Sequence, residues 1–118
     1  MGDMPESKPV FDLDSATLVK LVREMVDTGK INGHEIECPP TLHVGAAANP
    51  NSNPMGAEVL KIGRKAKAGV EFIQTQVVYD LDKTIEFLKG IKRYDIPVFL
   101  GIFPMKSYGM AKGFDMFV

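Results

Sequence analysis

The sequence predicts an α/β fold in which helices cover a parallel sheet. Segments with the 3.6-residue apolar period of helices alternate along the chain with short apolar runs that have strand character. This alternation is the pattern of right-handed βαβ units, whose strands run parallel. The chain has 118 residues, enough for one hydrophobic core. We therefore expect residues 1–118 to form a single domain.

The first helix is expected from about Asp14 to Thr28. Asp14 or Ser15 can cap its start, and Gly29 can end it. Its apolar stripe comprises Leu18, Leu21, Val22 and Met25. Residues 29–41 show no clear period, so we expect a longer connection there, with a small excursion at the bottom of the sheet.

The next three elements are a strand, a helix and a strand. Residues 42–48, LHVGAAA, are an apolar run of small and β-branched residues, which predicts a strand. The turn-forming cluster NPNSNP follows, and a helix is expected over residues 55–68. Its inward side chains are expected to be Val59, Ile62 and Ala66. Residues 71–79, EFIQTQVVY, predict the second strand.

The last three elements continue the alternation. Asp80 is placed to cap a third helix. The apolar face of that helix is marked by Leu81, Ile85, Leu88 and Lys92, and it is widened by Ile91. Residues 96–104, IPVFLGIFP, predict the third strand. A fourth helix is expected from about Ser107, and Gly109 and Gly113 weaken it.

Three polar residues interrupt the second predicted strand. Gln74 and Gln76 share one face of such a strand, and Thr75 points to the other. Because ligands of parallel βα folds sit beyond the carboxyl ends of the strands, Gln76 is a candidate binding residue. The alternative is that the two glutamines satisfy one another, or nearby backbone groups, within the core.

The loop after the first strand and the helix that follows it offer further polar candidates. Asn49 and Asn53 provide amide donors and acceptors at the rim of the sheet, and such residues are also ordinary turn formers. Lys61, Arg64 and Lys65 share one side of the helix. A solvated face is the default interpretation of these cations, and an anion site for a phosphate is the alternative.

Composition argues against several classes of function. A net charge of -1, with both signs interspersed, gives no electrostatic case for nucleic acid or an anionic membrane. No apolar stretch approaches the roughly 20 residues of a membrane helix, and no secretory signal is evident, so we expect a cytoplasmic protein. His34, His43 and Cys38 lack metal-ligand spacing, and no dinucleotide or phosphate-loop fingerprint occurs. No metal site is expected.

Four blocks of the sequence carry a family resemblance, in order and in register. They are GDMPESKPVFDLDS, VGAAANP, GRKAKAGVEFIQTQVVYD and FLGIFPMKSYGMAKGF. Together they resemble successive segments of the methylenetetrahydrofolate reductase family. The resemblance implies a (β/α)8 TIM barrel, of which this chain would be a partial barrel of roughly the fourth to seventh βα units. It also implies FAD as cofactor, NAD(P)H as reductant, and reduction of 5,10-methylenetetrahydrofolate to 5-methyltetrahydrofolate.

The same resemblance implies a set of site residues. Asp3 matches a catalytic aspartate near the flavin and the pterin, where its charge can favour the iminium form of the substrate. Gln76 matches a glutamine that hydrogen-bonds folate, and Lys65 matches a lysine near the FAD phosphates. Phe114 matches an aromatic residue of the folate and nicotinamide pocket, and Met110 lies at a substrate position that can be polar in relatives. The other implied flavin contacts are Asp12, Asn49, Asn53, Glu58 and Lys61.

The extent of the resemblance limits what the isolated chain is expected to do. A (β/α)8 barrel typically needs about 250 residues, and the family's glutamate general acid belongs to strands that this chain does not match. We therefore expect the isolated chain to be inactive as a reductase. The alternatives are a non-catalytic flavin- or folate-binding half-barrel, and a structural half-barrel that is stable only when it pairs with itself or is completed by another chain.

Overall fold

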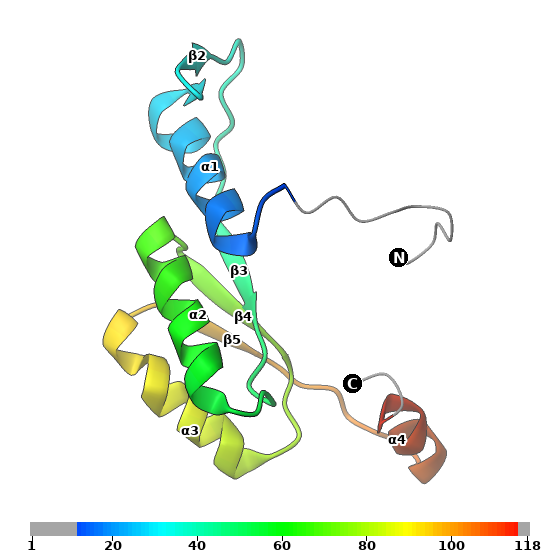
Figure 1. Cartoon of the computed structure of the whole chain (residues 1–118). Helices are drawn as coiled ribbons and strands as arrows, with labels where there is room; N and C mark the ends of the chain where they lie inside the picture. The colour runs from blue at the N-terminus through cyan, green and yellow to red at the C-terminus, as the bar shows by residue number, and fades with distance from the viewer. Residues whose placement is uncertain (1–11, 116–118) are drawn as a thin grey trace.

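Three parallel strands form the main sheet of the computed structural model, which describes residues 12–115. The strands are β3 (Gly45–Ala48), β4 (Phe72–Val77) and β5 (Val98–Gly101), and β4 lies between the other two. Both pairings are parallel (Figure 1). The predicted order of parallel strands and intervening helices is confirmed, and each strand is shorter than the apolar run that predicted it.

Within the described residues, four α-helices accompany this sheet. Figure 1 shows α2 and α3 side by side on one face of the sheet, α1 beyond α2, and α4 apart from the other three. The helices are α1 (Ser15–Thr28), α2 (Met55–Ala68), α3 (Leu81–Ile91), which continues into the short 3-10 turn η1 (Lys92–Tyr94), and α4 (Tyr108–Asp115). None of them combines the length and the apolar character that crossing a membrane requires.

Capping residues set the helix ends where the sequence predicted them. The Asp14 carboxylate accepts a hydrogen bond from the backbone N–H of Thr17 at 2.7 Å, which satisfies a donor of the first turn of α1. Gly29 ends that helix with a φ of 67°, in the left-handed region that favours glycine. Asp80 caps α3 in the same way as Asp14 caps α1. The predicted bounds of α2 are also confirmed.

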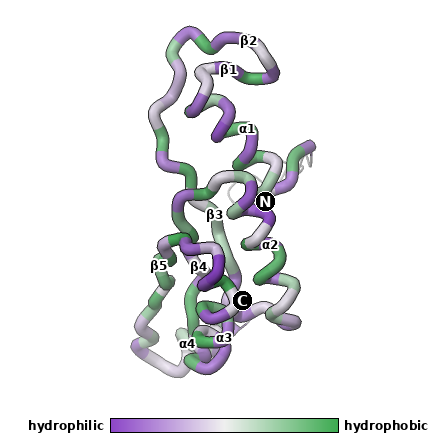
Figure 2. Tube along the Cα trace, turned by 90° about the vertical axis from the view of Figure 1, so that its left-hand side faces the viewer, coloured by the Kyte–Doolittle hydropathy of each residue, from purple (hydrophilic) through white to green (hydrophobic). Residues whose placement is uncertain are grey.

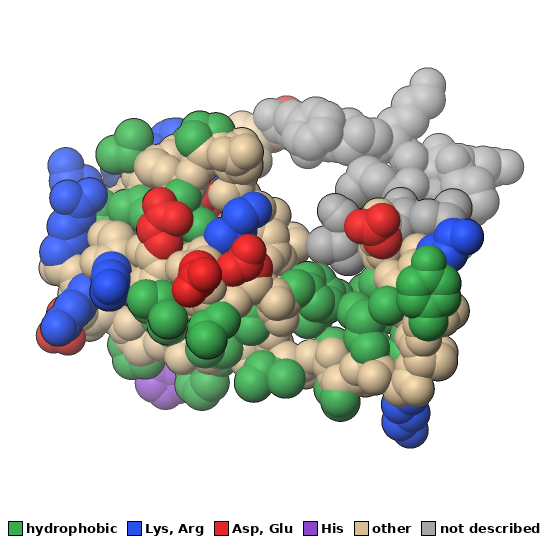
Figure 3. Space-filling model, turned by 90° about the horizontal axis from the view of Figure 1, so that it is seen from below, with side chains coloured by type: hydrophobic (Ala, Val, Ile, Leu, Met, Phe, Trp, Pro, Cys, Tyr) green, Lys and Arg blue, Asp and Glu red, His purple; other side chains and the backbone are tan. Residues whose placement is uncertain are grey.

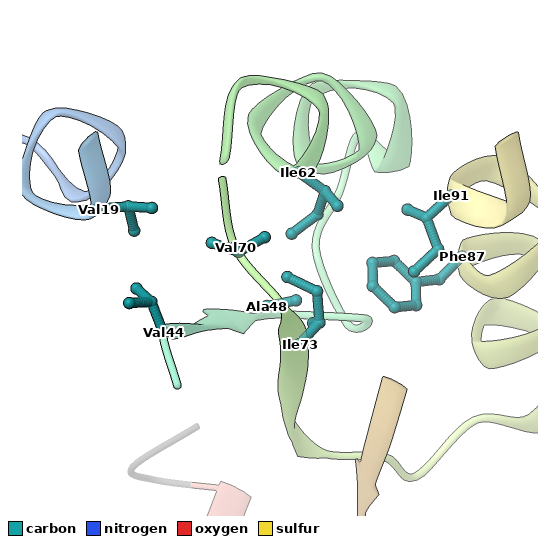
Figure 4. Packing of buried hydrophobic residues seen from close by; sticks show 8 residues of the cluster. All are labelled: Val19, Val44, Ala48, Ile62, Val70, Ile73, Phe87 and Ile91. Atoms are coloured by element: carbon teal, nitrogen blue, oxygen red, sulfur yellow. The ribbon is translucent and has the colours of Figure 1, made fainter. Parts of the chain in front are cut away.

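The hydrophobic core lies between the sheet and the layer formed by α2 and α3. Ile62 of α2, Ile73 of β4 and Phe87 of α3 are fully buried and meet there (Figure 4). The two helices approach closely at Gly90, where a Cβ atom would lie 2.7 Å from the Val59 side chain. The core therefore covers only one face of the sheet.

In two helices, the side that faces the core differs from the predicted apolar stripe. In α1, Leu18 is half exposed, and Val19 is the buried residue. In α3, Leu81 and Ile85 are exposed. The buried side chains of α3 are Thr84, Phe87 and Ile91. Phe87 is the largest apolar side chain of this helix, so turning it toward the sheet removes the most apolar surface from water.

A short hairpin lies in the connection for which the sequence showed no period. Strands β1 (Lys30–Ile31) and β2 (His34–Glu35) pair antiparallel around Asn32 and Gly33, whose φ angles are 48° and 79°. Positive φ at both central residues is typical of a type I′ turn, which Asn-Gly favours. Figure 2 shows this hairpin beyond the end of α1, away from the main sheet. The excursion predicted within residues 29–41 therefore contains regular secondary structure, a β-hairpin.

The face of the sheet opposite α2 and α3 is open within the described residues. Gln74 and Gln76 alternate with buried residues along β4 and lie on that face. Phe72 of β4 and Phe99 of β5 form an edge-to-face pair there, with ring centroids 5.7 Å apart. The described strands do not close into a barrel, and the radius of gyration, 17.1 Å, exceeds the ~13–14 Å of a compact chain of this length. The architecture is compatible with part of a TIM barrel.

A charged cluster ties α1 to the beginning of β4. Glu71 Oε2 accepts a hydrogen bond from the backbone N–H of Val44 at 2.7 Å, and Oε1 lies 3.1 Å from His43 Nδ1. The guanidinium of Arg23, on α1, lies 3.4 Å from the same carboxylate. The hydrogen bond from Val44, followed by the contacts with His43 and Arg23, lowers the pKa of Glu71.

We expect the free energy of unfolding to decrease as the pH falls below the ordinary pKa of a glutamate, 4.5. The ionised form of Glu71 stabilises the fold above that pH, and the stabilisation is lost as the pH falls through the lower pKa of the folded state. Asp14 adds a similar loss of stability below pH 3.8, the ordinary pKa of an aspartate, because hydrogen bonds from the Thr17 hydroxyl and amide lower its pKa in the folded state. Thermal unfolding followed by circular dichroism between about pH 7 and pH 3 measures the effect.

The matched control for this pH dependence is Glu71→Gln, which keeps an acceptor oxygen and removes the titrating group. Its melting temperature should vary less between about pH 5 and pH 3 than that of the wild type. An unchanged acid dependence in the variant would contradict the assignment to Glu71.

Candidate functional site

The loop that follows β3 is held in place at the carboxyl end of the sheet. The backbone N–H of Asn49 donates to Glu58 Oε1 at 2.8 Å, and the Asn49 side chain accepts from the backbone N–H of Asn51 at 3.0 Å. The Asn51 side-chain amide in turn donates to the Val77 carbonyl, at the end of β4, at 2.8 Å. The loop therefore joins the ends of two neighbouring strands and α2.

Glu58 is the buried anchor of this arrangement. Only 5% of the residue is exposed, and it stands in the first turn of α2, where a negative charge is favoured by the helix dipole. Lys61 Nζ lies 3.6 Å from Glu58 Oε2, which places a counter-charge beside the buried carboxylate. Lys61 itself is largely exposed. The sequence predicted Glu58 through the family resemblance alone, and it predicted Lys61 also as one of three cations on one side of the helix.

The three cations on one side of α2 each have a partner. Arg64 is exposed and donates to Asp14 Oδ2 at 3.0 Å, so α1 and α2 are joined there. Lys65 is half-buried, and its Nζ donates to the Ala47 carbonyl of β3 at 2.6 Å. The default interpretation of a solvated face fits Lys61 and Arg64 and is wrong for Lys65, because its ammonium reaches a strand.

Gln74 and Gln76 lie on the open face of β4 and are exposed. A shallow hollow of about 370 Å³ runs over this face, lined by both glutamines, Phe72 and the small residues of β3. Within the described residues the glutamines do not lie in the core, because the core is on the other face of the sheet. Their amides point into a space that a ligand can enter.

Thr75 is the polar residue of β4 that the core does contain. It is 6% exposed, and its hydroxyl accepts a hydrogen bond from the backbone N–H of Gly101 at 2.9 Å. A Cβ atom on Gly101 would lie 2.8 Å from the Thr75 carbonyl, so glycine lets β5 approach β4 at this irregular pairing. The sequence offered one signal for this role, a β-branched hydroxyl at a buried strand position.

A second hollow, of about 430 Å³, lies where β4 and β5 lead toward α3 and α4. Phe114 lines it together with Asn51, Tyr79 and Lys83. The Phe114 ring packs on that of Phe103 with centroids 4.8 Å apart. Figure 3 shows hydrophobic side chains gathered between the main body and α4. The sequence prediction included Phe114 and did not single out Asn51, Tyr79 or Lys83, because a lone loop or helix residue carries no pattern that distinguishes a site.

The remaining predicted site residues are not brought into these contacts. Asp12 and Asn53 are exposed at the two loops that precede α1 and α2. Met110 is 37% exposed on α4 and does not line either hollow. Asp3 lies outside the described residues. Among residues 12–115, no group of three or more potential metal ligands comes together.

Comparison with known proteins gives one family. The family model described as methylenetetrahydrofolate reductase matches residues 2–118. A search of curated proteins finds no match. The matched range spans the three strands, the loop after β3 and both hollows.

Proposed function

Since the chain belongs to the methylenetetrahydrofolate reductase family, we propose that it forms the flavin- and folate-facing part of an FAD-dependent reductase barrel. The overall reaction converts 5,10-methylenetetrahydrofolate, NAD(P)H and a proton into 5-methyltetrahydrofolate and NAD(P)⁺. FAD, when bound, supplies the hydride that it has received from NAD(P)H. The residues of this chain would bind and orient the cofactor and the substrate.

The observation that carries the proposal is the position of Gln76. Its amide is exposed at the carboxyl end of a central parallel strand, beside a hollow of about 370 Å³. A primary amide presents a donor and an acceptor side by side, which matches the adjacent donor and acceptor groups of a pterin edge. Pockets of about this size accept cofactor-sized ligands. Gln76 would orient the substrate ring over the open face.

The positive charges on one side of α2 are suited to bind the negatively charged phosphates of a dinucleotide cofactor. Lys61, Arg64 and Lys65 gather three positive charges against two carboxylates, those of Glu58 and Asp14. Lys65 reaches the sheet directly, where its Nζ lies 2.6 Å from the Ala47 carbonyl of β3. It would exchange or share that hydrogen bond with a phosphate oxygen, and a charge-assisted bond of that kind is the stronger of the two.

Two further residues complete the proposed division of roles. Phe114 offers an aromatic face at the second hollow, on which a planar ring can stack. Asp3, by the family resemblance, would place a negative charge near the substrate and favour its iminium form. Protonation of the folate N10 leaving group needs a general acid, and none of these residues is assigned that role. We therefore propose that the isolated chain binds its ligands without turnover.

The test is a folate titration of the flavin-loaded chain. Purified protein is incubated with FAD and desalted, and we expect a flavin absorbance band to remain. Folate added to this protein should perturb the band, and Gln76→Ala should weaken the folate affinity at least about fivefold, because the loss of one matched polar pair costs roughly 1–3 kcal/mol.

Gln74→Ala is the matched control, since Gln74 is also an exposed glutamine on the same face of the same strand. It lies two residues further from the strand end and should change the folate affinity by less than about threefold. A colourless wild-type protein after desalting would contradict flavin binding. Equal losses in the two variants would contradict the role given to Gln76.

A further inference from the structure

The hairpin formed by β1 and β2 presents an asparagine followed by a glycine at its turn. Asn32 and Gly33 are both exposed, and a Cβ atom on Gly33 would meet no atom beyond its chain neighbours within 4 Å. The hydrogen bond that closes a two-residue turn joins the flanking residues, here Ile31 and His34, and does not use the Gly33 N–H. The Asn32 side chain is therefore followed by an unhindered backbone amide.

An asparagine in this setting can lose its side-chain amide without an enzyme. The Gly33 nitrogen gives up its proton to solvent and attacks Cγ of Asn32, and the bond between Cγ and Nδ2 breaks. The departing nitrogen takes up a proton and leaves as ammonia, and a five-membered succinimide ring remains. Water then opens the ring at one of its two carbonyls, which gives aspartate or isoaspartate. Glycine favours the attack because it has no side chain to shield the nitrogen.

The other three asparagines of the chain are protected from this reaction. Asn49 and Asn53 each precede a proline, whose nitrogen carries no hydrogen. Asn51 precedes Ser52, but its side-chain amide donates to the Val77 carbonyl at 2.8 Å, and the Ser52 N–H donates to the Asn49 carbonyl at 3.2 Å. Both groups that would react at Asn51 are therefore already engaged in hydrogen bonds.

The hairpin that carries Asn32 is short and lies apart from the hydrophobic core. Each of its strands has two residues, and a backbone hydrogen bond from Ile36 to Gly29, at 2.9 Å, closes its base. Neither strand contributes to the core of the described residues, and Figure 2 shows the hairpin beyond the end of α1. Segments with few buried contacts open locally at low free energy. Such opening lets the Asn32 side chain reach the Gly33 nitrogen.

We propose that Asn32 is a site of spontaneous deamidation. The reaction consumes water and needs no other reagent, and it makes the net charge of the chain, -1 at pH 7, more negative. The aspartate product is compatible with the turn, because aspartate followed by glycine also favours type I′. The isoaspartate product adds a methylene group to the main chain, so β1 and β2 lose their register. The modification alters the hairpin and leaves the candidate site at the sheet unchanged.

Incubation of the purified 118-residue chain at neutral to mildly alkaline pH tests the proposal. Ion-exchange chromatography should resolve an acidic species that grows with time, and fragment-ion mass spectrometry should place aspartate and isoaspartate at position 32. The rate should rise with pH, because the attacking nitrogen must lose its proton. Asn32 should convert at least about tenfold faster than Asn51, because two hydrogen bonds must break before Asn51 can react.

Two asparagine-to-glutamine variants are the matched controls. Asn32→Gln keeps the amide, but its longer side chain cannot close the five-membered ring, so the acidic species should not form within the time that the wild type converts. Asn51→Gln should form it at the wild-type rate. In concentrated urea, Asn51 of the wild type should convert faster than in the folded chain, because both of its hydrogen bonds are then broken.

A wild-type chain that gains no acidic species would overturn the proposal. An acidic species that forms equally fast in Asn32→Gln would overturn it as well, because the reacting residue would then lie elsewhere. Conversion of Asn51 at the rate of Asn32 in the folded chain would show that the contacts of the loop after β3 give no protection, and the selectivity for Asn32 would be wrong.

Discussion

Replacement of Phe87 by alanine is expected to lower the free energy of unfolding by about 3–5 kcal/mol. The ring is fully buried between α3 and the sheet, beside Ile73 and Ile91 (Figure 4). Its removal costs the transfer free energy of the ring and leaves a cavity that neighbouring side chains fill only in part. A single-layer core has few other large residues, so this loss is a large part of a typical total of 5–15 kcal/mol.

Urea unfolding followed by circular dichroism measures the effect of Phe87→Ala. Leu81→Ala is the control, because Leu81 is an apolar residue of the same helix and is 73% exposed. It should change the free energy of unfolding by no more than about 0.5 kcal/mol. If Leu81→Ala destabilised the chain as much as Phe87→Ala, the rotation of α3 described above would be wrong.

Replacement of Glu58 by alanine is expected to cost about 1.5–3 kcal/mol of stability. The backbone N–H of Asn49 would lose an ionised acceptor 2.8 Å away, and Lys61 would lose its counter-charge. The loop after β3 should loosen first, since its end at Asn49 depends on this contact. Urea unfolding measures the stability, and hydrogen exchange at the Asn49 amide measures the local opening.

Glu58→Gln separates the hydrogen bond from the charge. Glutamine keeps an acceptor oxygen for the Asn49 amide but gives Lys61 no counter-charge. It should therefore lose less stability than Glu58→Ala and should keep the Asn49 amide protected from exchange. Equal exchange rates in the wild type and Glu58→Ala would show that this contact does not hold the loop.

The helix ends and strand order could be predicted from the sequence because they depend on local chemistry. Asp14, Asp80 and Gly29 act on atoms within a few residues of themselves, so their roles follow from residue type and position. The rotation of α3 could not be predicted in the same way. Two overlapping apolar stripes run along that helix, and the burial of Phe87 against the sheet selects one of them.

In the candidate site, too, the features set by local sequence could be predicted and the contacts between distant residues could not. The exposure of Gln76 at a strand end follows from strand alternation and the βα order. The hydrogen bond of Lys65 to Ala47 joins residues 18 apart, and that of Asn51 to Val77 joins residues 26 apart. No local pattern encodes such pairs, since they exist only after the strands have assembled. The roles implied for Asp3, Phe114 and Met110 stay predictions.

Two acceptors compete for the ammonium group of Lys65: the Ala47 carbonyl and, in the proposed function, a phosphate oxygen. In the present arrangement the ammonium donates to the carbonyl of β3. A phosphate-bearing ligand that draws Lys65 away would have to break this hydrogen bond first. Its observed affinity for Lys65 would therefore be lower than its affinity for an ammonium with no protein partner, by the net free energy of the hydrogen bond that is lost.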